Sequence, residues 1–172
     1  MSGNPQEIFA AGRFIARSKA PYFRALLHGL APQEVPGLGT IGVTSNGILM
    51  IDWEWIGKRT PDEVAGLLIH ECMHVALEHM QRCVRSGRDP RMSNLAGDLA
   101  INPAIIDMGM TLPGGDAKGI FPETFGFPRG LSLDEYYELL RQEAEKAKKK
   151  PGSSQVPRGA KGGQGEPGEG GE

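Results

Sequence analysis

A long helix with a clearly marked start is the feature of this sequence that most constrains its fold. Thr60-Pro61-Asp62-Glu63 combines a capping threonine, a proline at the first helical position and a glutamate that can bond back to the cap. After Gly66 no glycine or proline follows until Gly87, and the stretch between them is rich in apolar residues at helical spacing. We therefore predict one uninterrupted helix from Pro61 to Ser86.

Shorter elements surround this helix. Asn46-Gly47 is typical of a β-hairpin turn, because such turns require positive φ angles. Capping patterns recur at Asp89-Pro90 and at Ser132 with Glu135. The predicted elements are, in chain order, helices Gln6–Lys19 and Tyr22–Leu30, a connector Gly29–Gly39, hairpin strands Thr40–Thr44 and Ile48–Trp55, the long helix, a helix that starts at Asp89-Pro90 and is interrupted at Pro103, a loop Met108–Gly130 and a last helix Ser132–Gln142. This order predicts an α+β fold in which a small hairpin packs on the helices.

The last part of the chain has a different composition. Of the 25 glycines and 13 prolines in the 172 residues, eight glycines and three prolines lie in Pro151–Glu172. Such a segment has almost nothing apolar to bury. We predict a folded domain at residues 1–142 and a disordered tail or linker, rich in Gly, Pro, Glu and Lys, at residues 143–172.

Charge and hydropathy exclude two classes of partner. The formal net charge is -2 and the folding unit is slightly acidic, so we do not expect nucleic acid to be the main partner. Apolar runs are too short for a membrane span, and the first residues lack a signal pattern, so a cytoplasmic location without membrane contact is predicted. Cys72 and Cys83 are the only cysteines. On one helix they would lie about 16 Å apart, too far for a disulfide.

The long helix carries the pattern H-E-x-x-H in His70-Glu71-Cys72-Met73-His74. Residues four apart lie on one face of a helix, so the imidazoles of His70 and His74 can converge on one ion. Glu71 is about 100° round the helix, close enough to bond a metal-bound water without being a ligand. Neutral imidazoles suit zinc, and a catalytic zinc has three protein ligands and an open position for water. We predict a zinc site with Glu71 as the catalytic base.

Three residues compete for the role of third ligand. His79 lies about 140° from His74 on an uninterrupted helix, and Glu78 is two turns from His70, so neither is well placed. Asp98 and Asn102 interrupt the apolar face of the next helix, where a carboxylate needs a cation or strong donors. We therefore predict Asp98 as the third ligand.

Several stretches of the chain resemble a known family, the metallopeptidase domain usually found N-terminal to a VWA-like domain in bacterial and phage proteins. The matching stretches are Leu68–His79, Arg88-Asp89-Pro90, Asn94–Asn102 and Leu131–Leu140, and together with the Asn46-Gly47 hairpin the likeness covers about residues 10 to 140. The chain differs from the family in Ser93, where a tryptophan is frequent, and in lacking the VWA-like half.

This resemblance implies a zincin-like fold, a zinc-peptidase activity and, as partner, a VWA-like domain or its associated ATPase. The layout is also similar to that of the gluzincins, in which a second helix supplies an acidic ligand and an acidic residue one turn later supports the first histidine. Asp98 and Asn102 fit these two roles by spacing, with Asp in place of the gluzincin Glu.

The function predicted from these residues is peptide-bond hydrolysis. Zinc held by His70, His74 and Asp98 would activate a water whose proton Glu71 passes to the leaving amine. The strand Ile48–Trp55 is a candidate edge strand that pairs with an extended peptide or protein substrate, with Trp53 and Trp55 alternating on one face for packing. A side chain that would stabilise the oxyanion formed during hydrolysis is not marked by any motif. On composition alone, the candidates are Tyr136, Tyr137 and Arg91.

Two other functions stay open at this point. One is a zinc-stabilised, catalytically inactive binding module that acts with the VWA-like or ATPase partner, a role consistent with the Gly-rich, linker-like tail. The other is a peptide deformylase. The deformylase is less consistent with the sequence, because its motif works with a cysteine ligand upstream, whereas Cys72 and Cys83 lie within and after the motif.

Overall fold

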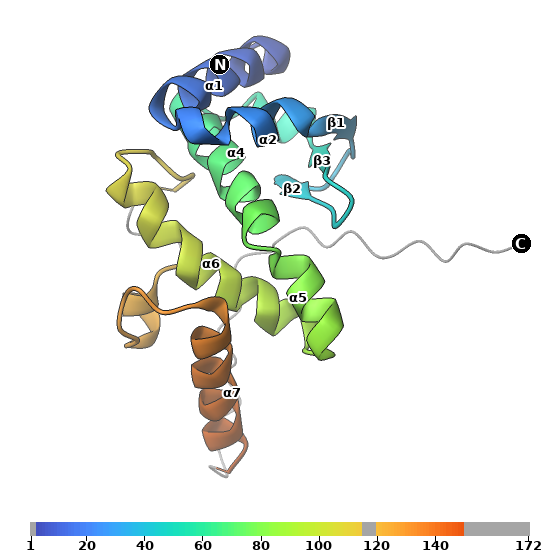
Figure 1. Cartoon of the computed structure of the whole chain (residues 1–172). Helices are drawn as coiled ribbons and strands as arrows, with labels where there is room; N and C mark the ends of the chain where they lie inside the picture. The colour runs from blue at the N-terminus through green and yellow to red at the C-terminus, as the bar shows by residue number, and fades with distance from the viewer. Residues whose placement is uncertain (1–2, 115–119, 150–172) are drawn as a thin grey trace, which may run out of the picture.

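The computed structural model describes residues 3–114 and 120–149, which form an α+β fold (Figure 1). The helices are α1 Pro5–Lys19, α2 Arg24–Gly29, α3 Trp53–Ile56, α4 Pro61–Ala76, α5 His79–Ser86, α6 Pro90–Asp107 and α7 Leu133–Lys149, with 3₁₀ turns η1 Pro21–Phe23 and η2 Pro122–Phe125, and the strands are β1 Ala31–Glu34, β2 Ile41–Val43 and β3 Ile48–Ile51. Within the described ranges no helix has the length and apolar content needed to cross a bilayer.

The small sheet has the strand order β1-β3-β2. The predicted hairpin is present as the antiparallel pair β2 and β3, and Gly47 in its turn has φ 80°. The parallel strand β1 was not predicted, because its four residues are all exposed and include Pro32, so no alternation of apolar residues marks it. The prediction of Ile48–Trp55 as an edge strand is therefore wrong: β3 is the central strand, and β2 and β1 form the edges.

The second half of the predicted strand Ile48–Trp55 is helical. Asp52 ends the strand by capping α3, since its carboxylate accepts hydrogen bonds from the amides of Trp55 at 3.1 Å and Gly39 at 2.9 Å. Trp53 and Trp55 therefore do not alternate on one strand face. They do serve packing: the Trp53 ring meets Phe9 edge-on, with the ring centroids 5.4 Å apart.

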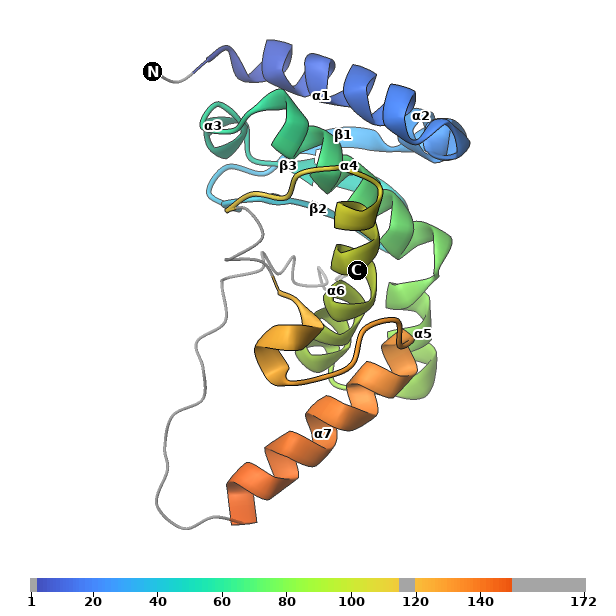
Figure 2. The same ribbon diagram turned by 90° about the vertical axis from the view of Figure 1, so that its left-hand side faces the viewer.

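Helix α4 is the central element of the fold and begins as predicted, with a complete capping box between Thr60 and Glu63. It packs on α1 and contacts β2 of the sheet, and its residues Leu68, Ile69 and Cys72 are buried in the core. Figure 2 shows α1 and the sheet at one end of the molecule and α7 at the other, with α4 and α6 between them. Residues of α4 and α6 are thereby brought close together.

The helix that starts at Pro61 ends ten residues earlier than predicted, at Ala76 rather than Ser86. Glu78 has φ 53° and is the one non-glycine residue with positive φ in the described part of the chain. This left-handed conformation costs about 1–2 kcal/mol in a residue with a side chain. The chain then restarts as α5, so the prediction of one uninterrupted helix is wrong, and His79 lies elsewhere than a straight helix would place it.

Helices α6 and α7 complete the fold. Asp89 caps α6 as predicted, but the helix continues through Pro103 to Asp107, because Ile105, beyond the proline, is fully buried in the core. The Ser132–Glu135 capping box forms, and α7 runs to Lys149 rather than ending at Gln142. The predicted tail from residue 150 onward lies outside the described residues, and the division into domains stays a prediction. Both cysteines are free, as expected.

Candidate metal centre

Helices α4 and α6 bring together the three side chains predicted as ligands. Nε2 of His70 and Nε2 of His74 are 2.9 Å apart. Asp98 Oδ1 lies 3.1 Å from His74 Nε2 and 3.3 Å from His70 Nε2. Within the described residues these three form a group that could hold a metal ion. The structure thus confirms that they meet, while their role as ligands stays a prediction.

The spacing of these three atoms suits zinc. A tetrahedral zinc ion with bonds of about 2.0–2.1 Å places its ligand atoms about 3.3–3.4 Å apart. The observed separations of 2.9, 3.1 and 3.3 Å are close to those values. Two imidazole lone pairs that face each other at 2.9 Å repel unless a proton or a cation lies between them. Two nitrogens and one carboxylate oxygen are also a donor set that zinc prefers.

Asn102 fixes the ring of His70. Its side-chain amide donates from Nδ2 to the carbonyl of Ile120 at 2.9 Å, so its oxygen Oδ1 faces His70 Nδ1, also at 2.9 Å. An oxygen can only accept, so His70 Nδ1 must carry a hydrogen, and in the neutral ring Nε2 has the lone pair that an ion would bind. This is the contact expected of an outer hydrogen-bond partner of a metal ligand.

The imidazole of His70 and the carboxylate of Asp98 stabilise each other's charged forms. Burial by itself lowers the pKa of His70, but the hydrogen bond and the charge of Asp98 outweigh it and raise that pKa to about 9. Burial opposes ionisation of Asp98 too, yet its bonds to His70 and His74 hold its pKa below the usual value. The site therefore favours a positive charge beside a carboxylate, and a bound cation would supply that charge.

Glu71 is buried beside this cluster. Its Oε2 accepts a hydrogen bond from the backbone amide of Val43 in β2 at 2.9 Å. Burial raises the pKa of Glu71, and the neighbouring histidines only partly counter that rise. A carboxylate with a raised pKa is the type of group that serves as a general base near neutral pH. The contact also shows that the edge strand β2 lies against the motif.

The two competing ligands do not join the cluster. Glu78 is exposed, and its carboxylate pairs with Arg85 at 2.8 Å. His79 is buried, but its Nδ1 lies 3.2 Å from Nδ1 of His74, on the nitrogen of His74 that faces away from Asp98. Sequence reasoning missed this neighbour, because the break at Glu78 that positions it has no glycine or proline to mark it.

The two tyrosines suggested for oxyanion stabilisation lie elsewhere. Tyr136 is fully buried and donates to the carbonyl of Pro128 at 2.8 Å, while the hydroxyl of Tyr137 accepts from the amide of Asp89 at 3.2 Å. Both tyrosines belong to the apolar cluster between α6 and α7. Arg91 is exposed in the first turn of α6. Neither tyrosine is brought to the histidines by a described contact.

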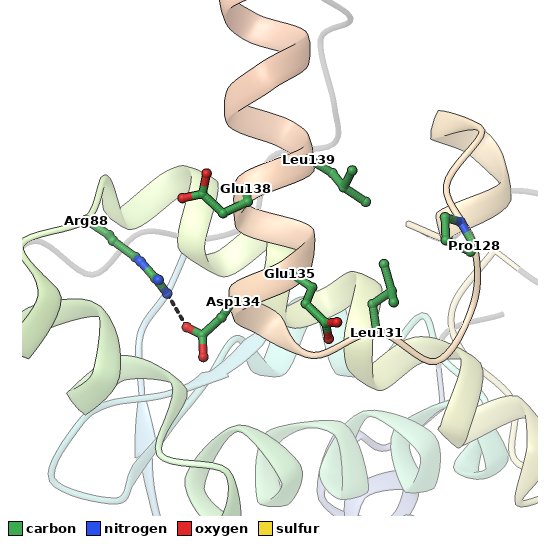
Figure 3. A pocket seen from close by; sticks show the side chains of 7 residues that line it. All are labelled: Arg88, Pro128, Leu131, Asp134, Glu135, Glu138 and Leu139. Atoms are coloured by element: carbon green, nitrogen blue, oxygen red, sulfur yellow. Dashed lines mark hydrogen bonds and ion pairs between the residues drawn. The ribbon is translucent and has the colours of Figure 1, made fainter.

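A cavity of about 500 Å³ lies beside the N-terminal turn of α7 (Figure 3). Asp134 at its rim forms ion pairs with Arg82 of α5 and with Arg88, which follows α5. These ion pairs join α7 to α5 and the turn after it. The residues lining this cavity include none of the histidines, Glu71 or Asp98. We therefore take the two-helix cluster, and not this cavity, as the candidate site.

Comparison with known proteins agrees with this geometry. A relative from Thermotoga maritima, named "Uncharacterized protein", is 32% identical over 96 residues. That match covers 52% of this chain and 24% of the relative, so the chain spans about a quarter of that protein's length. No solved structure matches the chain. Because the sequence model of the family described as "Putative metallopeptidase domain" matches residues 4–172, nearly the whole chain, the protein belongs to that family.

Proposed function

We propose that this protein is a zinc-dependent peptidase with a zincin-like fold, in which His70, His74 and Asp98 hold the metal and Glu71 is the general base. One observation carries the proposal: Nε2 of His70, Nε2 of His74 and Oδ1 of Asp98 converge from two helices at 2.9–3.3 Å. Membership of a family described as a metallopeptidase domain supports it.

The three ligands would leave the metal positively charged, because two neutral imidazoles and one carboxylate supply a single negative charge. A zinc ion in such a site lowers the pKa of a bound water toward about 7 and polarises a carbonyl. Asn102 holds His70 in the tautomer that presents Nε2. The near-complete burial of His74 and Asp98 keeps bulk water from competing for these atoms.

Glu71 would move the proton in this mechanism. Its Oε2 is held by the amide of Val43, which assigns proton transfer to Oε1. With its pKa raised by burial, the carboxylate takes the proton of the attacking water and delivers it to the leaving amine nitrogen. The Val43 bond fixes the rotamer of Glu71 beside the two histidines.

The outer edge of β2 is our proposed binding site for an extended peptide. The amide of Thr44 donates to Ile48 in β3, and the carbonyl of Thr40 accepts from Asp52 just after β3. The alternation of an antiparallel pair therefore turns the backbone groups of Ile41 and Val43 away from β3. Val43 donates to Glu71, so a peptide bound along this edge would lie next to the base. We therefore propose β2, in place of the strand suggested by sequence, as the substrate strand.

Metal analysis of the purified protein together with a peptide-library digest tests this function. Glu71→Gln should keep zinc and lower turnover by about 100- to 10,000-fold, because an amide cannot accept the water proton. Glu54→Gln is the matched control, since that carboxylate is exposed and pairs only with Lys58 among the described contacts. Bound zinc without cleavage of any peptide, or near-normal turnover in Glu71→Gln, would contradict the assignment.

A VWA-like domain or its associated ATPase stays our proposed partner. The support is that the Thermotoga maritima relative has about three quarters of its length outside the matched region, so this type of domain occurs joined to further polypeptide. Pull-down of the tagged chain from its native cells, followed by mass spectrometry, checks whether a protein with either domain copurifies.

A further inference from the structure

We propose that His79 is a positioning residue for the metal centre. His79 accepts a hydrogen bond from Nδ1 of His74 and so keeps the lone pair of His74 Nε2 directed at the metal. The inference rests on the proposed metal site and adds a residue that is not part of its ligand set. Two observations support it: the geometry of the His74 and His79 rings, and the break in the backbone at Glu78 that brings these rings together.

The two nitrogens of His74 face different partners. Nε2 points to His70 Nε2 and Asp98 Oδ1, at 2.9 and 3.1 Å. Nδ1 lies 3.2 Å from Nδ1 of His79, and the two rings meet edge-on at 85°. A neutral imidazole that offers Nε2 to a metal carries its hydrogen on Nδ1, and that hydrogen needs an acceptor. His79 supplies one if its own hydrogen is on Nε2.

The chain departs from regular helix to make this contact. On a continued helix His79 would lie about 140° from His74. Glu78 adopts φ 53° instead, and α5 starts at His79 with a new direction. As a result His79 is only 5% exposed and its ring packs beside His74. A backbone conformation that is unfavourable for a glutamate is thus coupled to the placement of one histidine.

Gly97 on α6 independently points to the same pair. A Cβ added there would lie 2.8 Å from His79 Nδ1 and 3.1 Å from His74 Cε1. Any side chain at this position would push the two rings from their contact. The glycine, which directly precedes the proposed ligand Asp98, therefore provides the space in which His74 and His79 meet.

Each proposed histidine ligand then has its own acceptor at Nδ1. Asn102 from α6 serves His70 through Oδ1 at 2.9 Å, and His79 from α5 serves His74 at 3.2 Å. Such outer partners fix the ring orientation and the tautomer of metal-binding histidines. The arrangement explains why the break between α4 and α5 directly follows the motif.

Two variants of His79 distinguish its role as a hydrogen-bond acceptor from its role in filling space beside His74. In His79→Asn the oxygen Oδ1 is one bond beyond Cγ, as Nδ1 is in histidine, so an acceptor remains. In His79→Phe a ring of similar size fills the space without an acceptor. Zinc affinity, measured by competition with a chelator, should fall about 10- to 100-fold in His79→Phe and stay within about threefold of wild type in His79→Asn.

NMR supplies a readout that packing alone would not change. In the zinc-loaded wild type and in His79→Asn, the Nδ1 hydrogen of His74 should give a slowly exchanging signal, which should be lost in His79→Phe. The melting temperature of the metal-free variants checks that both fold. Wild-type zinc affinity in His79→Phe would overturn the proposal, and so would an equal loss in both variants with equally lowered melting temperatures.

These outcomes are distinguishable from failure of the proposed function. If wild type binds zinc but cleaves no peptide, the peptidase assignment fails while the affinities still decide the role of His79. If wild type binds no zinc, both proposals are wrong.

Discussion

At the scale of single residues, Asp98 is the group on which the candidate site depends most. Among the described residues it is the one carboxylate paired with both His70 and His74, and it does so from a different helix. Asn102, one turn further along α6, contacts His70 at Nδ1, the nitrogen that faces away from Asp98. The two residues should therefore differ in how strongly they affect the metal.

Asp98→Ala should abolish tight zinc binding, because a site of two histidines remains. Asn102→Ala should weaken zinc by a smaller factor, about 10- to 100-fold, as expected for an outer hydrogen-bond partner. Competitive chelator titration measures both. Glu78→Gln is the control that should change nothing, since Glu78 is exposed and pairs with Arg85. Unchanged zinc affinity in Asp98→Ala would falsify the ligand assignment.

At the scale of elements, Gly66 decides how closely α4 approaches the segment after α6. A Cβ at Gly66 would lie 2.1 Å from the carbonyl oxygen of Thr111. Alanine in a helix is normally about 1 kcal/mol more favourable than glycine, but here the backbone of Thr111 would have to move. The close contact, and not helix propensity, should dominate.

We expect Gly66→Ala to lower the free energy of unfolding by about 2 kcal/mol, within the range found for overpacked cores. Gly29→Ala is its matched control, because a Cβ at Gly29 in α2 would meet nothing within 4 Å. That control should be neutral or slightly stabilising. Urea denaturation of the three proteins measures the difference, and equal stability of Gly66→Ala and wild type would show that Thr111 yields without cost.

The docking of α7 should depend on pH through Asp134. The hydrogen bond from Arg88, with the charge of Arg82, holds the pKa of Asp134 below its usual value of 3.8. A carboxylate with a lowered pKa in the folded state contributes stability above its unfolded pKa and loses it as the pH falls through the folded value. The contribution is therefore present at pH 7 and disappears below about pH 4.

Asp134→Asn should lower the free energy of unfolding at pH 7 by about 1 kcal/mol or less, because the side chain is 44% exposed and its ion pairs are screened by water. At pH 3 the variant and wild type should differ less. Asp107→Asn, whose side chain is 70% exposed with a single longer ion pair to Arg129 at 3.7 Å, should show no such pH-dependent difference. A gap that stays constant from pH 7 to pH 3 would argue against the role of Asp134.

At the scale of the whole molecule, two clusters of buried apolar side chains hold the elements together. The larger cluster joins α1, α2, the sheet, α4 and the second half of α6, and the smaller joins the first half of α6 to α7. The proposed metal ligands come from α4, which belongs to the larger cluster, and from α6, which contributes to both. Binding of an ion by both helices should therefore stabilise the assembly as well as form the site.

Removal of Pro151–Glu172 should leave the melting temperature and the metal content unchanged. This segment lies outside the described residues, and Val156 is its only large apolar residue. It can bury too little to offset an ordering entropy of about 1–2 kcal/mol per residue. Calorimetry and metal analysis of the shortened chain measure both quantities, and a clearly lower melting temperature would show that the segment packs on the domain.

The sequence by itself determined the features that depend on neighbours along the chain. The start of α4, the caps of α6 and α7 and the hairpin turn follow from side chains within three or four residues of the backbone groups they bind. The helical repeat also determined that His70 shares a face with His74, and Asp98 with Asn102, since that spacing is a property of each helix alone.

Tertiary structure alone decided the break at Glu78, the addition of β1 to the sheet and the close approach that Gly97 permits. Nothing next to Glu78 in the chain favours a left-handed residue there. Its cost is offset by the burial of His79 against His74 and α6, which are contacts between separate elements. A periodic pattern describes one element at a time. It therefore predicted that His70, His74 and Asp98 could bind a metal, but it did not predict that His79 would contact His74.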